Sequence, residues 1–325
     1  MNGAGRFASC RALLQEGKRR LLESGIQEAE TDARLLFCFV YGTEWSRLLL
    51  HYEDAPEVLL RERNGAGMSG APLREQRGTG PERAQGVSER TGETETAADA
   101  ERRYLEAIRR RAAHVPLQYI THGQFFCGFD FYVNESVLIP RQDTEILVET
   151  VLKDGGRGAL LDLCTGSGCI AVSLAKRGSF SEVTAADISE AALAVAAENA
   201  RRNDVRIALL HSDLFSASGE RRFDVITANP PYIRTEDIGA LAPEVREHEP
   251  RLALDGAADG LLFYRRLAGE CPSRLKRGGR IYFEIGCDQA EAVQALLSAQ
   301  GFTELRCVKD LNGLDRVVSG RIGHV

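Results

Sequence analysis

Residues 161–171 read LDLCTGSGCIA, and this stretch decides the fold. An apolar run that enters a glycine-rich turn and then resumes as apolar residues is typical of a strand, a tight loop and a helix. Glycine lets the backbone pass close to a ligand, because no Cβ stands in the way. The stretch therefore predicts a nucleotide-sized binding loop at the carboxyl edge of a sheet.

Strand and helix patterns alternate from about residue 158 to the end of the sequence. The predicted strands are Ala159–Leu163, Glu182–Asp187, Arg206–Leu210, Phe223–Ala228, Arg280–Ile285, Phe302–Lys309 and Asp315–Gly320, and the predicted helices lie near 169–177, 189–202, 259–275 and 288–299. Such alternation specifies an α/β fold, with a mostly parallel, Rossmann-like sheet covered on both faces.

Upstream of this sheet, residues 1–113 predict a small helical domain. Leu13, Leu14, Leu21 and Leu22 recur at roughly helical spacing, and Thr31 is a plausible helix start. Residues 114–140 predict a connecting β-hairpin, because QYITHGQFFCGFDFYVN alternates large apolar with small or polar residues. The domain that contains the sheet then spans residues 141–325.

One segment of the helical domain has a different composition. Residues 61–103 hold seven glycines, eight arginines and eight acidic residues, with few large apolar side chains. Such a segment buries too little surface to offset the entropy lost on ordering. We therefore predict a disordered insertion over about 62–98, by default a solvated loop.

Composition limits the function classes. The N-terminal residues lack the apolar core of a signal peptide, and no apolar run approaches the ~20 residues of a membrane span, so we expect a cytoplasmic protein. The eight cysteines include no Cys-x-x-Cys pair, which gives a metal or redox motif little support. A net charge of −6 makes nucleic acid an unlikely direct substrate.

The glycine-rich turn fits two kinds of cofactor. Residues 166–171 match the G-x-G-x-x-[GA] fingerprint of dinucleotide sites, and Asp187 ends the next predicted strand, 19 residues after Gly168. A carboxylate at that position can accept hydrogen bonds from both hydroxyls of a ribose. A dinucleotide and S-adenosylmethionine both satisfy this pattern.

A second motif separates these two possibilities. Asn229-Pro230-Pro231-Tyr232 directly follows the predicted strand Phe223–Ala228, and its two prolines make the turn rigid. The Asn229 side-chain oxygen and the Pro230 carbonyl can each accept one N–H of a substrate –NH₂ group, while Tyr232 offers a face for packing. This arrangement favours methyl transfer to a planar amino group, since hydride transfer has no use for it.

At this point the chain resembles a known family. Asn-Pro-Pro-Tyr is the signature of amino-methyltransferases that act on adenine N6 or glutamine N5, and further segments resemble the HemK/PrmC family of release-factor glutamine methyltransferases. These segments are residues 115–120, 138–145, 212–215, 229–233, 249–254 and 309–317, together with the cofactor turn. The resemblance covers essentially everything except about 62–98.

The resemblance implies a class I methyltransferase fold and a role for each motif. S-adenosylmethionine is held by Thr165, Gly166, Ser167, Gly168, Cys169 and Asp187, with Leu214 beside the adenine and Asn229 also in contact. The substrate glutamine is bound by Asn229, Pro230, Pro231 and Tyr232. Arg141 and Thr144, in the segment Ile139–Glu145, lie near cofactor or substrate, although a capped helix start explains this segment almost as well. The chain departs from the family at Gln142, Cys164 and Leu214.

The predicted activity is therefore methyl transfer from S-adenosylmethionine to N5 of the glutamine in the Gly-Gly-Gln motif of class 1 peptide-chain release factors. The predicted partners are those factors, with no metal and no membrane. The alternative is an adenine-N6 methyltransferase of DNA or RNA, which needs a base-flipping site and a phosphate-binding surface.

Overall fold

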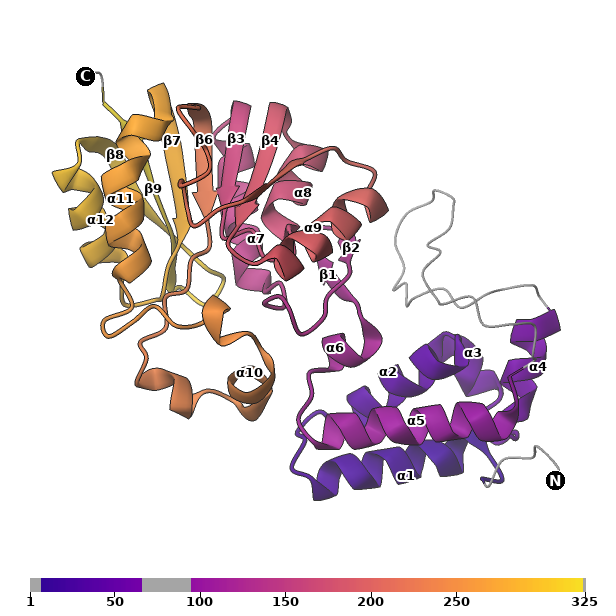
Figure 1. Ribbon diagram of the computed structural model, residues 1–325. Coiled ribbons are helices and arrows are strands. Elements are labelled where there is room, and N and C mark those ends of the chain that lie inside the picture. The colour runs from indigo at the N-terminus through magenta and orange to yellow at the C-terminus, as the bar shows by residue number, and fades with distance from the viewer. Residues whose placement is uncertain (1–6, 66–94, 324–325) are drawn as a thin grey trace. The chain divides into compact units, whose positions relative to one another are not determined.

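A computed structural model describes residues 7–65 and 95–323 of the chain (Figure 1). The chain divides into two compact units, Met1–Thr121 and His122–Val325. None of the described helices is both long and apolar enough to cross a membrane.

The first unit is helical, as expected. Its elements are α1 (Cys10–Glu23), α2 (Ala29–Tyr41), α3 (Trp45–Leu50), α4 (Glu57–Gly65), α5 (Ala97–Ala112) and α6 (Leu117–Thr121). Apolar side chains at helical spacing on α1, α2 and α5, among them Leu13, Phe37 and Tyr104, form one core. Gly17 permits close packing of α1 on α5, since a Cβ there would lie 2.1 Å from the Tyr104 hydroxyl oxygen. Helix α2 begins at Ala29, before Thr31.

Both flanks of the predicted insertion belong to this unit. Residues 66–94 lie outside the described residues; α4 continues to Gly65 before them, and Glu95 is the first described residue after them. Glu95 pairs with Arg63 and Arg103, each at 2.5 Å. Thr96 caps α5 through a capping box with Asp99. Residues 62–65 and 95–98, which the prediction placed in the insertion, therefore belong to the described helical unit.

The predicted hairpin is shorter than expected. Strands β1 (Gln124–Phe126) and β2 (Phe129–Phe131) pair antiparallel, and Cys127 and Gly128 both have positive φ, as a two-residue hairpin turn requires. Leu117–Thr121 is a helix instead of a strand. Tyr119 and Ile120 are adjacent and both buried, a pattern that a single-sided alternating strand does not give. The alternation in this short stretch was therefore misleading.

The second unit contains the predicted α/β sheet. Its strands, in the order β5-β4-β3-β6-β7-β9-β8, are β3 (Arg157–Leu163), β4 (Ser179–Asp187), β5 (Ala208–His211), β6 (Phe223–Ala228), β7 (Leu275–Glu284), β8 (Phe302–Lys309) and β9 (Asp315–Ile322). Strands β3 to β7 pair in parallel, and β9 pairs antiparallel with both β7 and β8. The expectation of a mostly parallel sheet is confirmed.

Helices cover both faces of this sheet (Figure 1). These helices are α7 (Gln142–Lys153), α8 (Cys169–Arg177), α9 (Glu190–Arg202), α11 (Leu262–Arg274) and α12 (Ala290–Ala299). The short helix α10 (Pro243–His248) lies beyond the ends of the strands, between 3₁₀ turns at Asp237–Ala240 and Arg251–Ala253. Side chains of α11 and α12 pack with Leu161 and Leu163, while those of α7 and α8 pack with Leu160 on the opposite face. Strand β3 is therefore buried on both sides, which explains its apolar sequence.

The strand order reverses between β3 and β6. The chain runs from β3 outward to β4 and β5, and then returns to place β6 on the other side of β3. A crevice forms at such a reversal, outside the carboxyl ends of the strands. The turn after β3 and the turn after β6, which carry the two predicted motifs, are thereby neighbours.

Candidate active site

The glycine-rich turn follows β3 as predicted. Gly166 and Gly168 have φ of +53° and +77°, a region that favours glycine. A Cβ on Gly168 would lie 3.0 Å from the Ala196 side chain, so this glycine also allows the turn to pack against α9. A Cβ on Gly166 would meet no atom within 4 Å, which leaves space for a ligand against the backbone.

A buried carboxylate beneath the turn holds it in place. Asp162 accepts hydrogen bonds from the hydroxyls of Thr165 at 2.6 Å and Thr227 at 2.7 Å. Burial raises the pKa of Asp162 to about 7, although both hydroxyl donors lower it. Asp162 was not among the predicted site residues. The signal was a lone acid inside the apolar strand sequence, where a charged residue is rare unless it has partners.

Asp187 binds the same turn from the end of β4. Its two carboxylate oxygens accept from the backbone N–H of Gly166 at 2.8 Å and of Ser189 at 2.9 Å. Burial raises its pKa, against the effect of these N–H donors. Each oxygen retains acceptor capacity for a further donor, such as a ligand hydroxyl. Asp187 is therefore both an anchor of the turn and a candidate ligand for a ribose.

Asn199 is a further anchor of the turn, and it was not among the predicted site residues. It is fully buried on α9, and its Nδ2 donates to the carbonyls of Ser167 at 2.8 Å and Tyr132 at 2.9 Å. Its Oδ1 accepts from the Tyr132 N–H at 2.6 Å. One side chain thus connects the hairpin segment to the glycine-rich turn. No local sequence pattern marks such a role, since its partners lie 32 and 67 residues away.

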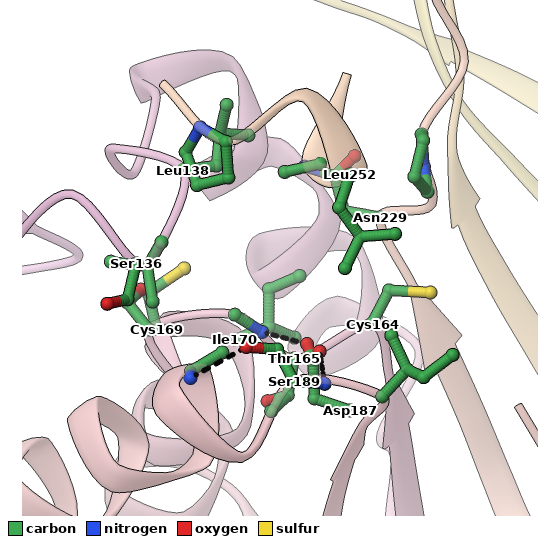
Figure 2. Close-up of a pocket in the computed structure, with 18 of the residues that line it drawn as sticks. Ser136, Leu138, Cys164, Thr165, Cys169, Ile170, Asp187, Ser189, Asn229 and Leu252 are labelled. Atoms are coloured by element: carbon green, nitrogen blue, oxygen red, sulfur yellow. Dashed lines mark hydrogen bonds between the residues drawn. The ribbon is translucent and has the colours of Figure 1, made fainter. Parts of the chain in front are cut away.

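A pocket lies over the turn at this edge of the sheet (Figure 2). Of the predicted site residues, it is lined by Arg141, Thr144, Thr165, Gly166, Ser167, Cys169, Asp187, Leu214, Asn229 and Pro231. Gly168, Pro230 and Tyr232 are not among its lining residues. Figure 2 shows Asn229 and Leu252 on the side of the pocket away from Asp187. Other lining residues that were not predicted include Phe263 and Arg266 of α11, which the sequence separates widely from both motifs.

The Asn229 turn is held firmly against the core. Asn229 follows β6 directly, and its Nδ2 donates to the Thr144 hydroxyl at 3.4 Å, so that Oδ1 remains available to a ligand. Pro230 is buried, and the half-buried Tyr232 packs against the apolar core. The Tyr232 carbonyl accepts from Gln289 Nε2 at 3.0 Å. These contacts fix the backbone that displays Asn229.

Arg141 reaches across to the segment that follows α10. Its guanidinium forms an ion pair with the buried Glu249, which also accepts from the Ile139 N–H at 3.4 Å. Burial raises the pKa of Glu249, and Arg141 opposes that rise. Arg141 also occupies the N-cap position of α7 without a side-chain capping bond. It therefore combines a pocket position with a structural pairing to Glu249.

Among residues 7–65 and 95–323, no three histidine, cysteine, aspartate or glutamate side chains are grouped as a metal would require. The pocket instead combines a carboxylate at Asp187, apolar walls that include Leu214 and Phe263, and the open backbone at Gly166. These are features of a nucleoside-binding site.

Two family models match the chain. Residues 12–62 match a model described as the PrmC N-terminal domain, and residues 141–251 match one described as the methyltransferase small domain. The two matches fall in the helical unit and in the sheet unit respectively.

Two curated relatives carry one and the same name, release factor glutamine methyltransferase. The chain is 38% identical over 305 residues to a release factor glutamine methyltransferase of Cereibacter sphaeroides, covering 93% of this chain and 95% of the relative. It is 50% identical over 217 residues to one of Geobacter sulfurreducens, covering 66% and 76%. A solved protein-(glutamine-N5) methyltransferase (release factor-specific) from Alicyclobacillus acidocaldarius is 34% identical, with a TM-score of 0.37, covering 60% of this chain and 100% of that one. The resemblance inferred from the motifs is confirmed, and the chain belongs to the release factor glutamine methyltransferase family.

Proposed function

We propose that this enzyme transfers a methyl group from S-adenosylmethionine to the side-chain amide nitrogen of the glutamine in the Gly-Gly-Gln motif of class 1 release factors. The observation that supports this most directly is the orientation of Asn229. Its amide nitrogen bonds to Thr144, which leaves its oxygen available to a substrate –NH₂ group at the pocket.

The pocket fits S-adenosylmethionine. Asp187 would accept from the ribose hydroxyls, Leu214 would pack by the adenine, and the backbone from Thr165 to Cys169 would surround the rest of the molecule. Phe263 supplies a further apolar wall of the same pocket. When bound, this cofactor supplies an electrophilic methyl group on a sulfonium centre.

The residues of the chain orient the nucleophile. An amide nitrogen is a weak nucleophile because its lone pair is delocalised into the carbonyl. Asn229 Oδ1 and the Pro230 carbonyl each accept one N–H of the substrate amide, which fixes its nitrogen in near-attack geometry. Both acceptors also stabilise the positive charge that develops on this nitrogen. Tyr232 packs against the planar group, and no base is needed before methyl transfer.

The helical domain has the second role in this proposal. The Asn229 acceptors recognise any planar –NH₂ group, so they cannot distinguish one glutamine from another. We assign recognition of the folded release factor to the helical domain of residues 1–113. Access to the pocket we assign to the hairpin near residues 118–133 and to the segment Ile139–Glu145. Release factors act on the ribosome, so the cytoplasm is the compartment in which we place the enzyme.

The rival activity, methylation of adenine N6, has less support. Asn-Pro-Pro-Tyr serves both chemistries, but the net charge of −6 does not suit a protein that grips a phosphate backbone. The curated relatives described above are named for release factor glutamine. Incubation with methyl-labelled S-adenosylmethionine distinguishes the two: we expect label in a release factor and none in DNA or RNA. Label in nucleic acid alone would contradict the proposal.

We expect an intact release factor to be methylated far more efficiently than a short Gly-Gly-Gln peptide. The reacting amide is the same in both, so the difference should fall mainly on KM, with kcat little changed. Each ~1.4 kcal/mol of docking away from the pocket lowers KM about tenfold. Steady-state kinetics with both substrates measures how the difference divides between KM and kcat. A release factor whose motif glutamine is replaced by alanine is the control and should take up no label. Equal KM values would remove the docking role from the helical domain.

A further inference from the structure

A buried glutamate lies beside the catalytic turn without forming part of the pocket. Glu284 is the last residue of β7, the strand that pairs with β6. The register places Ala228 opposite Phe283, so Asn229 and Glu284 are the next residues along these two parallel strands. Paired residues on adjacent strands lie about 4.8 Å apart in the sheet. The topology therefore sets Glu284 next to Asn229.

This glutamate is enclosed and only partly satisfied. Its residue is 1% exposed, and it is absent from the residues that line the pocket. Its backbone carbonyl accepts from the Tyr264 hydroxyl at 2.7 Å, but side-chain Oε2 has no hydrogen-bond partner among the described residues. A buried carboxylate oxygen without a partner destabilises a fold. A destabilising group that is retained beside an active site indicates a function there, so we expect a role of Glu284 at Asn229.

The groups that face Glu284 come from several elements. Burial raises the pKa of Glu284 to about 7, and the Thr144 hydroxyl, the Arg316 guanidinium and the Asn229 amide lower it from the still higher value that burial alone would give. Asp143 on α7 raises it. The other titratable neighbours are Tyr232 and Tyr264, whose own pKa values are raised by burial and by Glu284, and Cys169 on α8.

Two of these neighbours belong to the proposed catalytic turn or its support. Asn229 Nδ2 donates to Thr144 Oγ1 at 3.4 Å, and both groups lie close enough to the Glu284 carboxylate to stabilise its charge. A carboxylate only accepts hydrogen bonds, so it favours the amide nitrogen of Asn229 on its own side. The amide oxygen is then directed away from Glu284, toward the pocket.

We propose that Glu284 is a positioning residue, whose ionised side chain fixes the Asn229 amide with its oxygen toward the substrate. This role rests on the proposed function of Asn229. A protonated Glu284, or a glutamine in its place, carries a donor that can bond to Asn229 Oδ1. It thereby permits the reversed amide, which presents –NH₂ to the substrate –NH₂ and cannot accept its hydrogens.

The test is the pH dependence of kcat for the wild type and for Glu284→Gln, at saturating S-adenosylmethionine and saturating release factor. In the wild type we expect kcat to rise with pH through one ionisation near pH 7 and then to level off. In Glu284→Gln we expect a kcat at pH 8 lowered by about ten- to a hundredfold and no ionisation near pH 7. Since the substitution acts on the reacting geometry, the Kd of S-adenosylmethionine by calorimetry should stay within a factor of two or three.

Matched variants distinguish a positioning role of Glu284 from a general loss of structure. Glu291→Gln makes the same change at an exposed site on α12 and should keep wild-type kcat and pH profile. Glu284→Asp keeps a carboxylate at this position. Its kcat should therefore lie between those of the wild type and Glu284→Gln, and it should still rise with pH. Asp162, whose pKa is also raised to about 7, is still present in Glu284→Gln, so loss of the ionisation near pH 7 in that variant assigns it to Glu284.

The melting temperature tests the ionisation of Glu284 independently of the activity assay. Folding raises the pKa of Glu284 from its ordinary 4.5 to about 7, so protonation favours the folded state. That contribution is present below pH 4.5 and is lost as pH rises to 7. Glu284→Gln should therefore melt higher than the wild type at pH 8, with the gap closing toward pH 5.

The possible results bear on two separate claims. A wild type that labels the factor, together with a Glu284→Gln variant of equal kcat and unchanged pH profile, overturns the positioning role alone. Loss of cofactor binding in proportion to kcat does the same, because it indicates a structural role. A wild type that leaves every release factor unlabelled overturns the proposed function, and the role of Glu284 with it.

Discussion

Asn229→Ala is expected to lower kcat by about 10²–10³-fold while the protein stays folded and binds S-adenosylmethionine. Removal of one positioned acceptor of a transition-state hydrogen has effects of this order in enzymes. The side chain also holds the substrate nitrogen in line with the methyl group, and that alignment is lost with it. In the structure the Asn229 amide donates to the Thr144 hydroxyl at 3.4 Å, a long contact, so the fold loses little.

Single-turnover methylation of a release factor measures the loss, and calorimetry measures cofactor binding on the same sample. Asn312→Ala, in the exposed turn between β8 and β9, makes the matching substitution at a site that we assign no role. We expect it to retain wild-type turnover. If Asn229→Ala also turns over at the wild-type rate, Asn229 is not the acceptor and the proposed chemistry fails.

Asp187→Ala is expected to weaken S-adenosylmethionine binding by at least tenfold, and by about a hundredfold if both ribose hydroxyls bond to it. Hydrogen bonds to a charged group contribute about 1.5–3 kcal/mol each, and about 1.4 kcal/mol corresponds to tenfold in Kd. The structure adds a second reason. Asp187 accepts from Gly166 N–H at 2.8 Å, so its removal also frees the turn that must surround the cofactor.

Calorimetric titration gives Kd, and kcat at saturating cofactor should be reduced far less than kcat/KM. Asp237→Ala, on the exposed 3₁₀ turn Asp237–Ala240, serves as the matched control and should leave Kd unchanged. If Asp187→Ala loses turnover but keeps its affinity for the cofactor, Asp187 does not bind the cofactor and has another role.

Local patterns predicted the framework well. Residues 169–177, Phe223–Ala228 and Phe302–Lys309 have the predicted bounds, because each combines a clear hydrophobic period with a residue that ends it. The Asn229 turn and the Asp187 position were also found from sequence. Strand endings and rigid turns depend on neighbouring residues, and parallel strands bring their carboxyl ends to one edge.

The buried residues that hold these site residues in place were harder to predict. Asp162 bonds to Thr227, 65 residues away, and Asn199 bonds to Tyr132 at a distance of 67 residues. Glu284 stands at the end of an apolar strand, where its charge is conspicuous, but the sequence does not show which strand lies beside it. Long-range partners follow from the strand order, and one sequence does not fix that order.

The position of β9 has a consequence for how the protein matures during synthesis. Strand β8 leaves the ribosome before β9, yet it forms the edge of the sheet and is joined to it by β9. Arg316, which faces Glu284, also lies on β9. A nascent chain can therefore assemble β3 to β7 and the cofactor turn while β8 is still unpaired and the surroundings of Asn229 are incomplete. The charged surroundings of Glu284, and with them those of Asn229, are complete only once β9 has joined the sheet.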